Sequence, residues 1–208
     1  MKTNILAIGA HPDDVELGTL GSLIKWSKHG RITMVVCSNG EKGSSKDQEK
    51  TNHRVEEAKR SARACDAEII FLGLEDGAIP NNLETVSKLD QIIRDVKPDR
   101  LLVHHPDDVH QDHRNVALST ISAARRTKEV LFYETPSTTR SSFQPNFYVN
   151  ISLEIDAKFK VLQIHQSQRT KDYFSREAVY GVAAYHALTI NKMNAYYEAF
   201  QVFRYIVE

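Results

Sequence analysis

Five short apolar runs, separated by segments with helical periodicity, limit the fold of this chain more than any other feature. The runs are NILAIGA (4–10), ITMVVCS (32–38), EIIFLG (68–73), RLLVHH (100–105) and EVLFYE (129–134). Each run is nearly continuous in hydrophobicity and does not alternate between apolar and polar residues. Such runs are typical of strands that are buried on both faces of a parallel sheet.

Helical patterns fill the gaps between these runs. Apolar residues recur at helical spacing in four segments: Leu17 to Ile24, Val55 to Cys65, Val86 to Val96, and Val116 to Ala124. Strands that alternate with helices of this length predict βαβ units with right-handed crossovers. We therefore expect one α/β domain over residues 1–208, a three-layer α/β/α Rossmann-like sandwich. Its sheet should be mostly parallel, with the core strand order 3-2-1-4-5.

The last third of the chain has a different pattern. FYVNIS (147–152) predicts one more strand, whereas residues 153–164 and 172–203 are expected to be mostly helical. The segment Glu134 to Asn146 contains two prolines and a Ser/Thr cluster, so it should be a long loop. It is too short to link independent domains, and we expect it to border a site.

Composition argues against several classes of partner. Lys plus Arg and Asp plus Glu number 27 each, so no overall field favours nucleic acid or an anionic membrane. Cys37 and Cys65 have no metal-binding spacing, which favours buried thiols in a reducing compartment. The apolar run at the start is short and is broken at once by HPDD, unlike a signal peptide or membrane span. A cytoplasmic protein that binds neither nucleic acid nor membrane is expected.

The pentapeptide HPDDV occurs twice, at residues 11–15 and 105–109. Each copy directly follows a predicted parallel strand, the first and the fourth, and these are neighbours in the order 3-2-1-4-5. Open α/β sheets bind ligands at the carboxyl ends of such strands. We therefore interpret the two copies as two walls of one site. A dinucleotide site is disfavoured, because the first turn lacks G-x-G-x-x-G and places two carboxylates where a pyrophosphate would bind.

Histidines and aspartates gather at these two strand ends. They are His11, Asp13, Asp14, His105, Asp107, Asp108, His110, Asp112 and His113. Imidazoles together with carboxylates are the ligands expected for zinc or a similar divalent ion. Four ligands would form a closed structural site and three would leave a position for water, and spacing alone does not choose between them. Asp13 as a general base and Asp112 as the partner of an imidazole favour the open site.

The segment AHPDDVELG together with the later HQDH resembles the LmbE/PIG-L family of zinc-dependent N-deacetylases. That family includes the sugar deacetylases of mycothiol and bacillithiol synthesis and the N-acetylglucosaminyl-phosphatidylinositol deacetylases. The resemblance implies a hydrolase with one Zn²⁺ per chain, although other divalent metals would also suit the ligands. Its substrate would be a small N-acetylated amino sugar or a conjugate of one. Assembly with further copies of the chain is left open.

The resemblance also implies roles for individual residues. Asp13 would be the general base, and His110, held by Asp112, would act as an imidazolium that stabilises the oxyanion and protonates the leaving amine. RVEE resembles the R-x-x-E segment of the family, which makes Arg54 a candidate substrate contact and Glu57 a structural partner. The residues that would bind the metal are His11, Asp14 and His113.

Two departures from the family pattern narrow the substrate. Asp108 stands where the members that act on mycothiol precursors have tyrosine, which disfavours that pathway. No membrane anchor is apparent, which disfavours a phosphatidylinositol-linked substrate. Two other functions compete with deacetylation: a metal phosphoesterase, and a non-catalytic binding or regulatory module with a structural zinc site.

Overall fold

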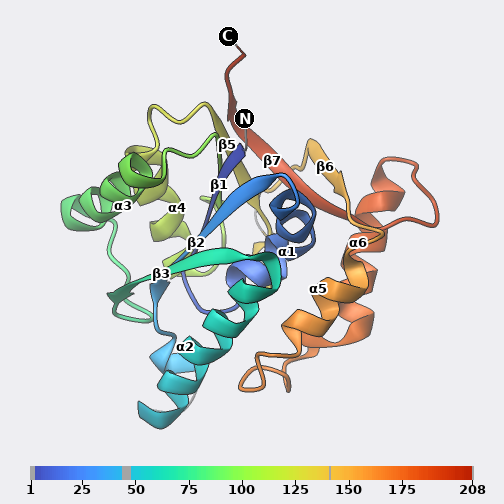
Figure 1. The fold of residues 1–208 in the computed structure, drawn as a ribbon, viewed down its shortest axis with the longest axis horizontal. Helices are drawn as coiled ribbons and strands as arrows, with labels where there is room; N and C mark the ends of the chain where they lie inside the picture. Colours follow the sequence, from blue (N-terminus) through green and yellow to red (C-terminus); the bar gives the residue numbers. More distant parts are fainter. Residues whose placement is uncertain (1–2, 44–47, 141, 208) are drawn as a thin grey trace.

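A seven-stranded sheet forms the centre of the protein (Figure 1), whose computed structural model describes residues 3–43, 48–140 and 142–207. The strands are β1 (Thr3–Gly9), β2 (Gly30–Ser38), β3 (Ala67–Leu74), β4 (Arg100–His104), β5 (Glu129–Tyr133), β6 (Phe147–Asn150) and β7 (Tyr197–Tyr205). Their order across the sheet is β3-β2-β1-β4-β5-β7-β6. The first five strands pair in parallel. The predicted core order is therefore confirmed, and two further strands extend it beyond β5.

Helices cover both faces of the sheet. They are α1 (Asp14–Ser27), α2 (Gln48–Ala62), α3 (Leu83–Val96), α4 (Gln111–Ala123), α5 (Ile155–Leu162) and α6 (Arg176–Thr189). One apolar core joins one face to α1, α2, α5 and α6, and a second joins the opposite face to α3 and α4. Figure 1 shows α3 and α4 together on one side of the strands. The protein therefore has the predicted three-layer α/β/α architecture.

The end of the chain corrects one prediction. Residues 172–203 were expected to be mostly helical, but α6 ends at Thr189 and β7 begins at Tyr197. β7 pairs antiparallel with β5 and with β6, and it buries residues 198–200. Tyr197, Phe200 and Phe203 lie three apart, a spacing that resembles a helix in the sequence. Backbone pairing with β5 outweighs that local pattern.

Helix α1 packs unusually close to β5. A Cβ atom added to Gly18 would lie 2.3 Å from the ring of Tyr133 and 2.8 Å from the carbonyl oxygen of Glu134. Only glycine therefore allows α1 to approach the end of β5 at this point. The close approach brings the start of α1, with the first HPDDV, next to the loops that follow β4 and β5.

Candidate metal centre

The two HPDDV segments lie side by side at the carboxyl ends of β1 and β4. These strands pair in parallel up to Ile8 and Val103, so both chains leave the sheet at the same edge. The first segment leads into α1 and the second into α4. They are therefore two walls of one site, as the sequence suggested.

Three side-chain atoms converge between these walls. His11 Nδ1 lies 3.2 Å from Asp14 Oδ2, and His113 Nε2 lies 3.3 Å from His11 Nδ1 and 3.4 Å from Asp14 Oδ2. A tetrahedral zinc site with bonds of about 2.0–2.1 Å separates its ligand atoms by about 3.3–3.4 Å. The three residues are 4–8% exposed. They thus form one face of a tetrahedron of suitable size for a divalent metal.

Carboxylates hold the far side of the His11 ring. Nε2 of His11 lies 3.1 Å from Asp112 Oδ2 and 3.1 Å from Asp76 Oδ1. The Asp112 carboxylate in turn accepts hydrogen bonds from the backbone N–H groups of Gly77 (2.7 Å) and Ile79 (3.2 Å). A carboxylate on the second ring nitrogen fixes the orientation of a metal-binding imidazole.

His113 is oriented in the same way by a different aspartate. Its Nδ1 lies 3.2 Å from Asp108 Oδ2, which also accepts a hydrogen bond from Thr138 Oγ1 at 2.7 Å. The ring of His113 stacks on that of His104, with 3.9 Å between ring centroids. Asp108, which departs from the mycothiol-type pattern, therefore supports a candidate metal ligand in this chain.

The Asp112 carboxylate does not hold the ring of His110, contrary to our expectation. The Asp112 carboxylate contacts His11, whereas His110 Nδ1 accepts a hydrogen bond from the backbone N–H of Asp112 at 3.2 Å and caps α4. Nδ1 must be unprotonated to accept this bond, which leaves Nε2 to bear the hydrogen. Burial, followed by the charges of His113 and His11, lowers the pKa of His110. These observations favour a neutral imidazole that donates through Nε2, in place of the imidazolium that the family resemblance implied.

Asp13 is paired with Arg54. Asp13 Oδ1 lies 3.3 Å from Arg54 Nη2, and Arg54 Nη1 donates to the Gly40 carbonyl oxygen at 2.7 Å. Burial raises the pKa of Asp13, while the Arg54 charge opposes this rise. Arg54 is buried, with 3% of its surface exposed, and its contact with the carboxylate holds Asp13 in position. Arg54 also lines the cavity above the cluster, where we expected it to contact substrate.

The cluster carries an excess of negative charge. Burial acts to lower the pKa of His11, but hydrogen bonds with Asp112 and Asp14 outweigh it and raise the value to about 12. Burial likewise opposes protonation of His113, yet Asp14 and Asp108 raise its pKa to about 9. The field at the centre of the cluster therefore favours a positive charge, as a metal site requires.

Two of the predicted candidates lie outside this cluster. His105 packs edge-on against Phe132 and Phe143, with ring centroids 5.5 and 5.6 Å apart. Asp107 accepts a hydrogen bond from the backbone N–H of Ser142 at 3.0 Å. Both residues stabilise the loops after β4 and β5. Within the second HPDDV, Asp108 is thus the residue that supports a candidate metal ligand.

The sequence interpretation missed two residues of the site. Asp76 follows the carboxyl end of β3, and His104 is the last residue of β4. His104 Nε2 lies 3.2 Å from Asp14 Oδ2 and accepts the backbone N–H of Ala10 at 3.0 Å. The strand-end argument that selected HPDDV applies equally to both residues and could have found them.

A cavity of about 330 Å³ opens over the cluster. Beyond the histidines and aspartates it is lined by Leu17, Lys42, Arg54, Gly77, Thr135, Pro136, Ser137, Lys171 and Tyr173. The segment from Glu134 therefore does border the site. Glu57 accepts hydrogen bonds from the N–H (3.0 Å) and hydroxyl (2.6 Å) of Ser167, which is the structural role expected for it.

Comparison with known proteins places this site in a family. The family model described as PIG-L, GlcNAc-PI de-N-acetylase, matches residues 6–124, more than half of the chain. The chain belongs to the PIG-L family. The match runs from β1 to the end of α4 and so includes both walls of the metal centre.

Individual relatives of this PIG-L protein cover most of its length. The uncharacterized deacetylase YaiS of Escherichia coli is 34% identical over 80% of this chain and 92% of its own. The diacetylchitobiose deacetylase of Thermococcus kodakarensis is 27% identical over 81% of this chain and 71% of its own. Among solved structures, the 4-carboxy-2-hydroxymuconate hydratase GalB of Pseudomonas putida has the same fold. It covers 100% of this chain and 98% of its own at 20% identity, with a TM-score of 0.86.

Proposed function

We propose that this PIG-L protein is a zinc-dependent hydrolase that removes the N-acetyl group from an N-acetylglucosamine-type amino sugar or a conjugate of one. The observation that supports it most is the set of three converging atoms from His11, Asp14 and His113, with Asp13 beside them. The relatives from Escherichia coli and Thermococcus kodakarensis support the same reaction class, since both are named as deacetylases.

The donor set fits zinc in both chemistry and spacing. His11, Asp14 and His113 would hold the ion, and Asp112, Asp76 and Asp108 would keep the two imidazoles in place. When bound, zinc supplies Lewis acidity, which makes water more acidic and an amide carbonyl more electrophilic. Three protein ligands leave room for water and substrate, which favours catalysis over a closed structural site.

Asp13 moves the proton in this proposal. It accepts one proton from the attacking water while the remaining hydroxide adds to the amide carbonyl carbon. The raised pKa of Asp13 suits it to holding that proton, and Arg54 keeps the carboxylate in position. Asp13, in place of His110 as first expected, then gives the proton to the nitrogen as the C–N bond breaks, so that the products are a free amine and acetate.

His110 stabilises the charge that develops on the carbonyl oxygen. Its Nδ1 is engaged by the α4 backbone, so the Nε2–H group is the donor available to the substrate. His110 gathers with His11 and His113, and one ring nitrogen from each of the three lies within 4.8 Å of the others. A donor fixed beside these two candidate ligands can stabilise negative charge that develops on a substrate oxygen there.

The test combines metal analysis with acetate release. Zinc-loaded protein should contain about one zinc per chain and release acetate from N-acetylglucosamine or diacetylchitobiose. Asp13→Asn should keep the metal and lose roughly a hundredfold to ten-thousandfold in kcat. His113→Ala serves as the comparison, because it should lose the metal itself.

The same measurements separate the competing functions. A structural zinc site would hold metal without releasing acetate from any acetylated sugar. A phosphoesterase would release phosphate, and a hydratase such as GalB would add water to a double bond without forming acetate. Full turnover by metal-loaded Asp13→Asn would contradict the proposed proton transfer.

A further inference from the structure

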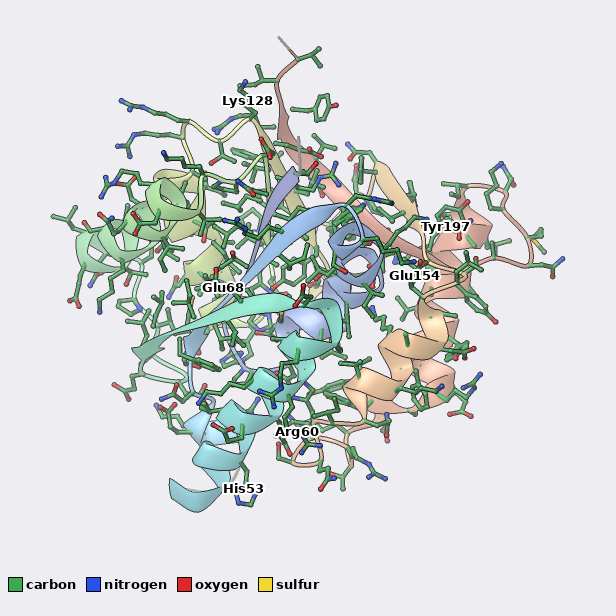
Figure 2. The ribbon with its side chains drawn as sticks, viewed as in Figure 1. His53, Arg60, Glu68, Lys128, Glu154 and Tyr197 are labelled. Atoms are coloured by element: carbon green, nitrogen blue, oxygen red, sulfur yellow. The ribbon has the colours of Figure 1, made fainter. Side chains whose placement is uncertain are left out.

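A second cavity, of about 210 Å³, adjoins the metal centre. It lies on the side of the molecule where α6 packs against β7, near Tyr197, which Figure 2 labels. Its apolar wall is formed by Leu17, Pro136, Ala178, Val179, Val182 and Ala183. The start of β7 pairs with the end of β5, so this cavity opens at the same edge of the sheet as the metal centre.

The two cavities share part of their lining. Leu17, Thr135, Pro136 and Tyr173 line both of them. Leu17 follows the candidate ligand Asp14 by three residues on α1, so both side chains lie on the same face of that helix. The apolar cavity therefore begins about 5 Å, one helical turn, from the metal centre.

The charged groups around the apolar cavity are bound to other parts of the protein. Lys158 Nζ donates to the Leu17 carbonyl oxygen at 2.6 Å and to Glu198 Oε1 at 2.7 Å. Glu198 also accepts the backbone N–H groups of Gly21 (2.9 Å) and Ser22 (2.7 Å). These contacts join α1, α5 and β7, so the walls are held in place. The surface that they leave to a ligand is mainly hydrocarbon.

The opposite side of the metal centre is polar. Lys42 and Asp76 come from the loops after β2 and β3, and Arg54 comes from α2 and bonds the Gly40 carbonyl oxygen in the first of these loops. In the sheet order, β2 and β3 lie on one side of β1, whereas β5 and β7 lie on the other. A scissile amide at the metal centre thus has a polar region on one side and an apolar region on the other.

We propose that the apolar cavity receives the hydrocarbon of the acyl group, so that the enzyme hydrolyses N-acyl amino sugars whose acyl chain is longer than acetyl. This inference rests on the proposed function. The hydroxyl groups of the sugar match the polar side, and the acyl group lies across the amide bond from the sugar. An apolar cavity of about 150 Å³ holds a benzene ring, so this larger one accommodates roughly four to six acyl carbons.

The test is a kinetic series with a single sugar. Zinc-loaded enzyme is assayed for release of free glucosamine from N-acetyl-, N-butanoyl- and N-hexanoylglucosamine. Burial of a methylene group is worth about 0.8 kcal/mol, which is about fourfold in kcat/KM for each methylene that enters the cavity. We expect N-hexanoylglucosamine to exceed N-acetylglucosamine by at least about tenfold.

A pair of helix variants connects that preference to the cavity. Ala178 is partly buried and lines the cavity, so Ala178→Leu places a larger side chain within it. Ala184 is exposed on the same helix and lies outside the cavity, so Ala184→Leu is the matched control. Ala178→Leu should abolish most of the hexanoyl-to-acetyl ratio, and Ala184→Leu should leave the ratio as in the wild type. Thermal unfolding of both variants verifies that they are folded.

Three results would overturn the assignment. If N-acetylglucosamine is hydrolysed but the longer substrates are no better, the cavity does not take the acyl chain. If the hexyl glycoside of N-acetylglucosamine gains instead, and Ala178→Leu removes that gain, the cavity holds the aglycone. If the zinc-loaded wild type hydrolyses no member of the series, the proposed function itself fails.

Discussion

His110 shows how one side chain decides between two kinds of metal site. Its Nδ1 accepts the backbone N–H of Asp112 in α4, and the three atoms that converge at 3.2–3.4 Å come from His11, Asp14 and His113. We therefore expect His110→Ala to retain zinc and to lower kcat by roughly a hundredfold to a thousandfold, with little change in KM. Metal analysis and steady-state kinetics on the same preparation measure both effects.

A second variant at this position separates hydrogen bonding from mere packing. His110→Gln keeps an N–H donor on a side chain of similar reach, so it should recover part of the rate that His110→Ala loses. Loss of zinc from His110→Ala would instead mean that the site is closed around four ligands. In that case the metal would have a structural role.

The sequence predicted which side chains converge at this site better than it predicted their partners. His11, Asp14 and His113 converge because their positions relative to the strand ends and helix starts determine where they point. The support from Asp112 to His11 joins residues that are 101 positions apart in the chain. Asp108 and His113 are only five positions apart, but their contact depends on how the segment before α4 folds. Such pairings depend on tertiary distances, and residue spacing does not contain them.

At the scale of elements, the loop after β2 controls Asp13 through Arg54. Gly40 has a φ of +72°, and a Cβ atom added there would lie 2.4 Å from Arg54 Nη1. Gly40→Ala should therefore displace the guanidinium from Asp13 while the metal ligands remain. Misplacement of this kind costs roughly tenfold to a hundredfold in kcat. Metal content should stay unchanged in the same protein.

Gly73 provides the matched control for this substitution. It also has a positive φ, +62°, but an added Cβ would meet nothing within 4 Å. Gly73→Ala therefore carries a similar backbone penalty without moving Arg54. Equal activities of the two variants would show that Arg54 does not position Asp13.

The helices and strands were predictable where local pattern and burial agree. The runs that form β1 to β5 are apolar on both faces, so their character is visible in the sequence itself. β7 is different, because Tyr197, Phe200 and Phe203 have the spacing of a helix face. The strand forms because β5 and β6 provide partners on both of its edges. The presence of these partner strands cannot be read from the sequence of β7 itself.

At the scale of the whole molecule, a buried His165–Glu16 pair makes stability depend on pH. His165 Nε2 lies 3.2 Å from Glu16 Oε1, and Glu16 also bonds Ser61 of α2. Burial opposes protonation of His165, but the charge of Glu16 outweighs it and raises the pKa above the ordinary 6.5. The folded state then holds this proton more tightly than the unfolded state, so the contribution of the pair is complete below pH 6.5 and declines above it.

His165→Gln tests this dependence, because glutamine can still hydrogen-bond Glu16 but cannot carry the charge. The free energy of unfolding should be higher for the wild type by on the order of 1 kcal/mol near pH 6. That difference should shrink as the pH rises to about 9. Urea unfolding of both zinc-saturated proteins measures it. A difference that is constant or grows with pH would contradict the assignment.

The place of β7 in the sheet also has a consequence for biosynthesis. Glu198 accepts hydrogen bonds from α1 residues that are 176 and 177 positions earlier in the chain, and β7 fills the gap between β5 and β6. While the ribosome still holds residues 197–205, β5 has an open edge and α1 lacks one of its anchors. Contacts between such distant segments form slowly, since a long loop must close first. We therefore expect the nascent chain to complete the β5 edge of the sheet, and the anchoring of α1, only after β7 has emerged.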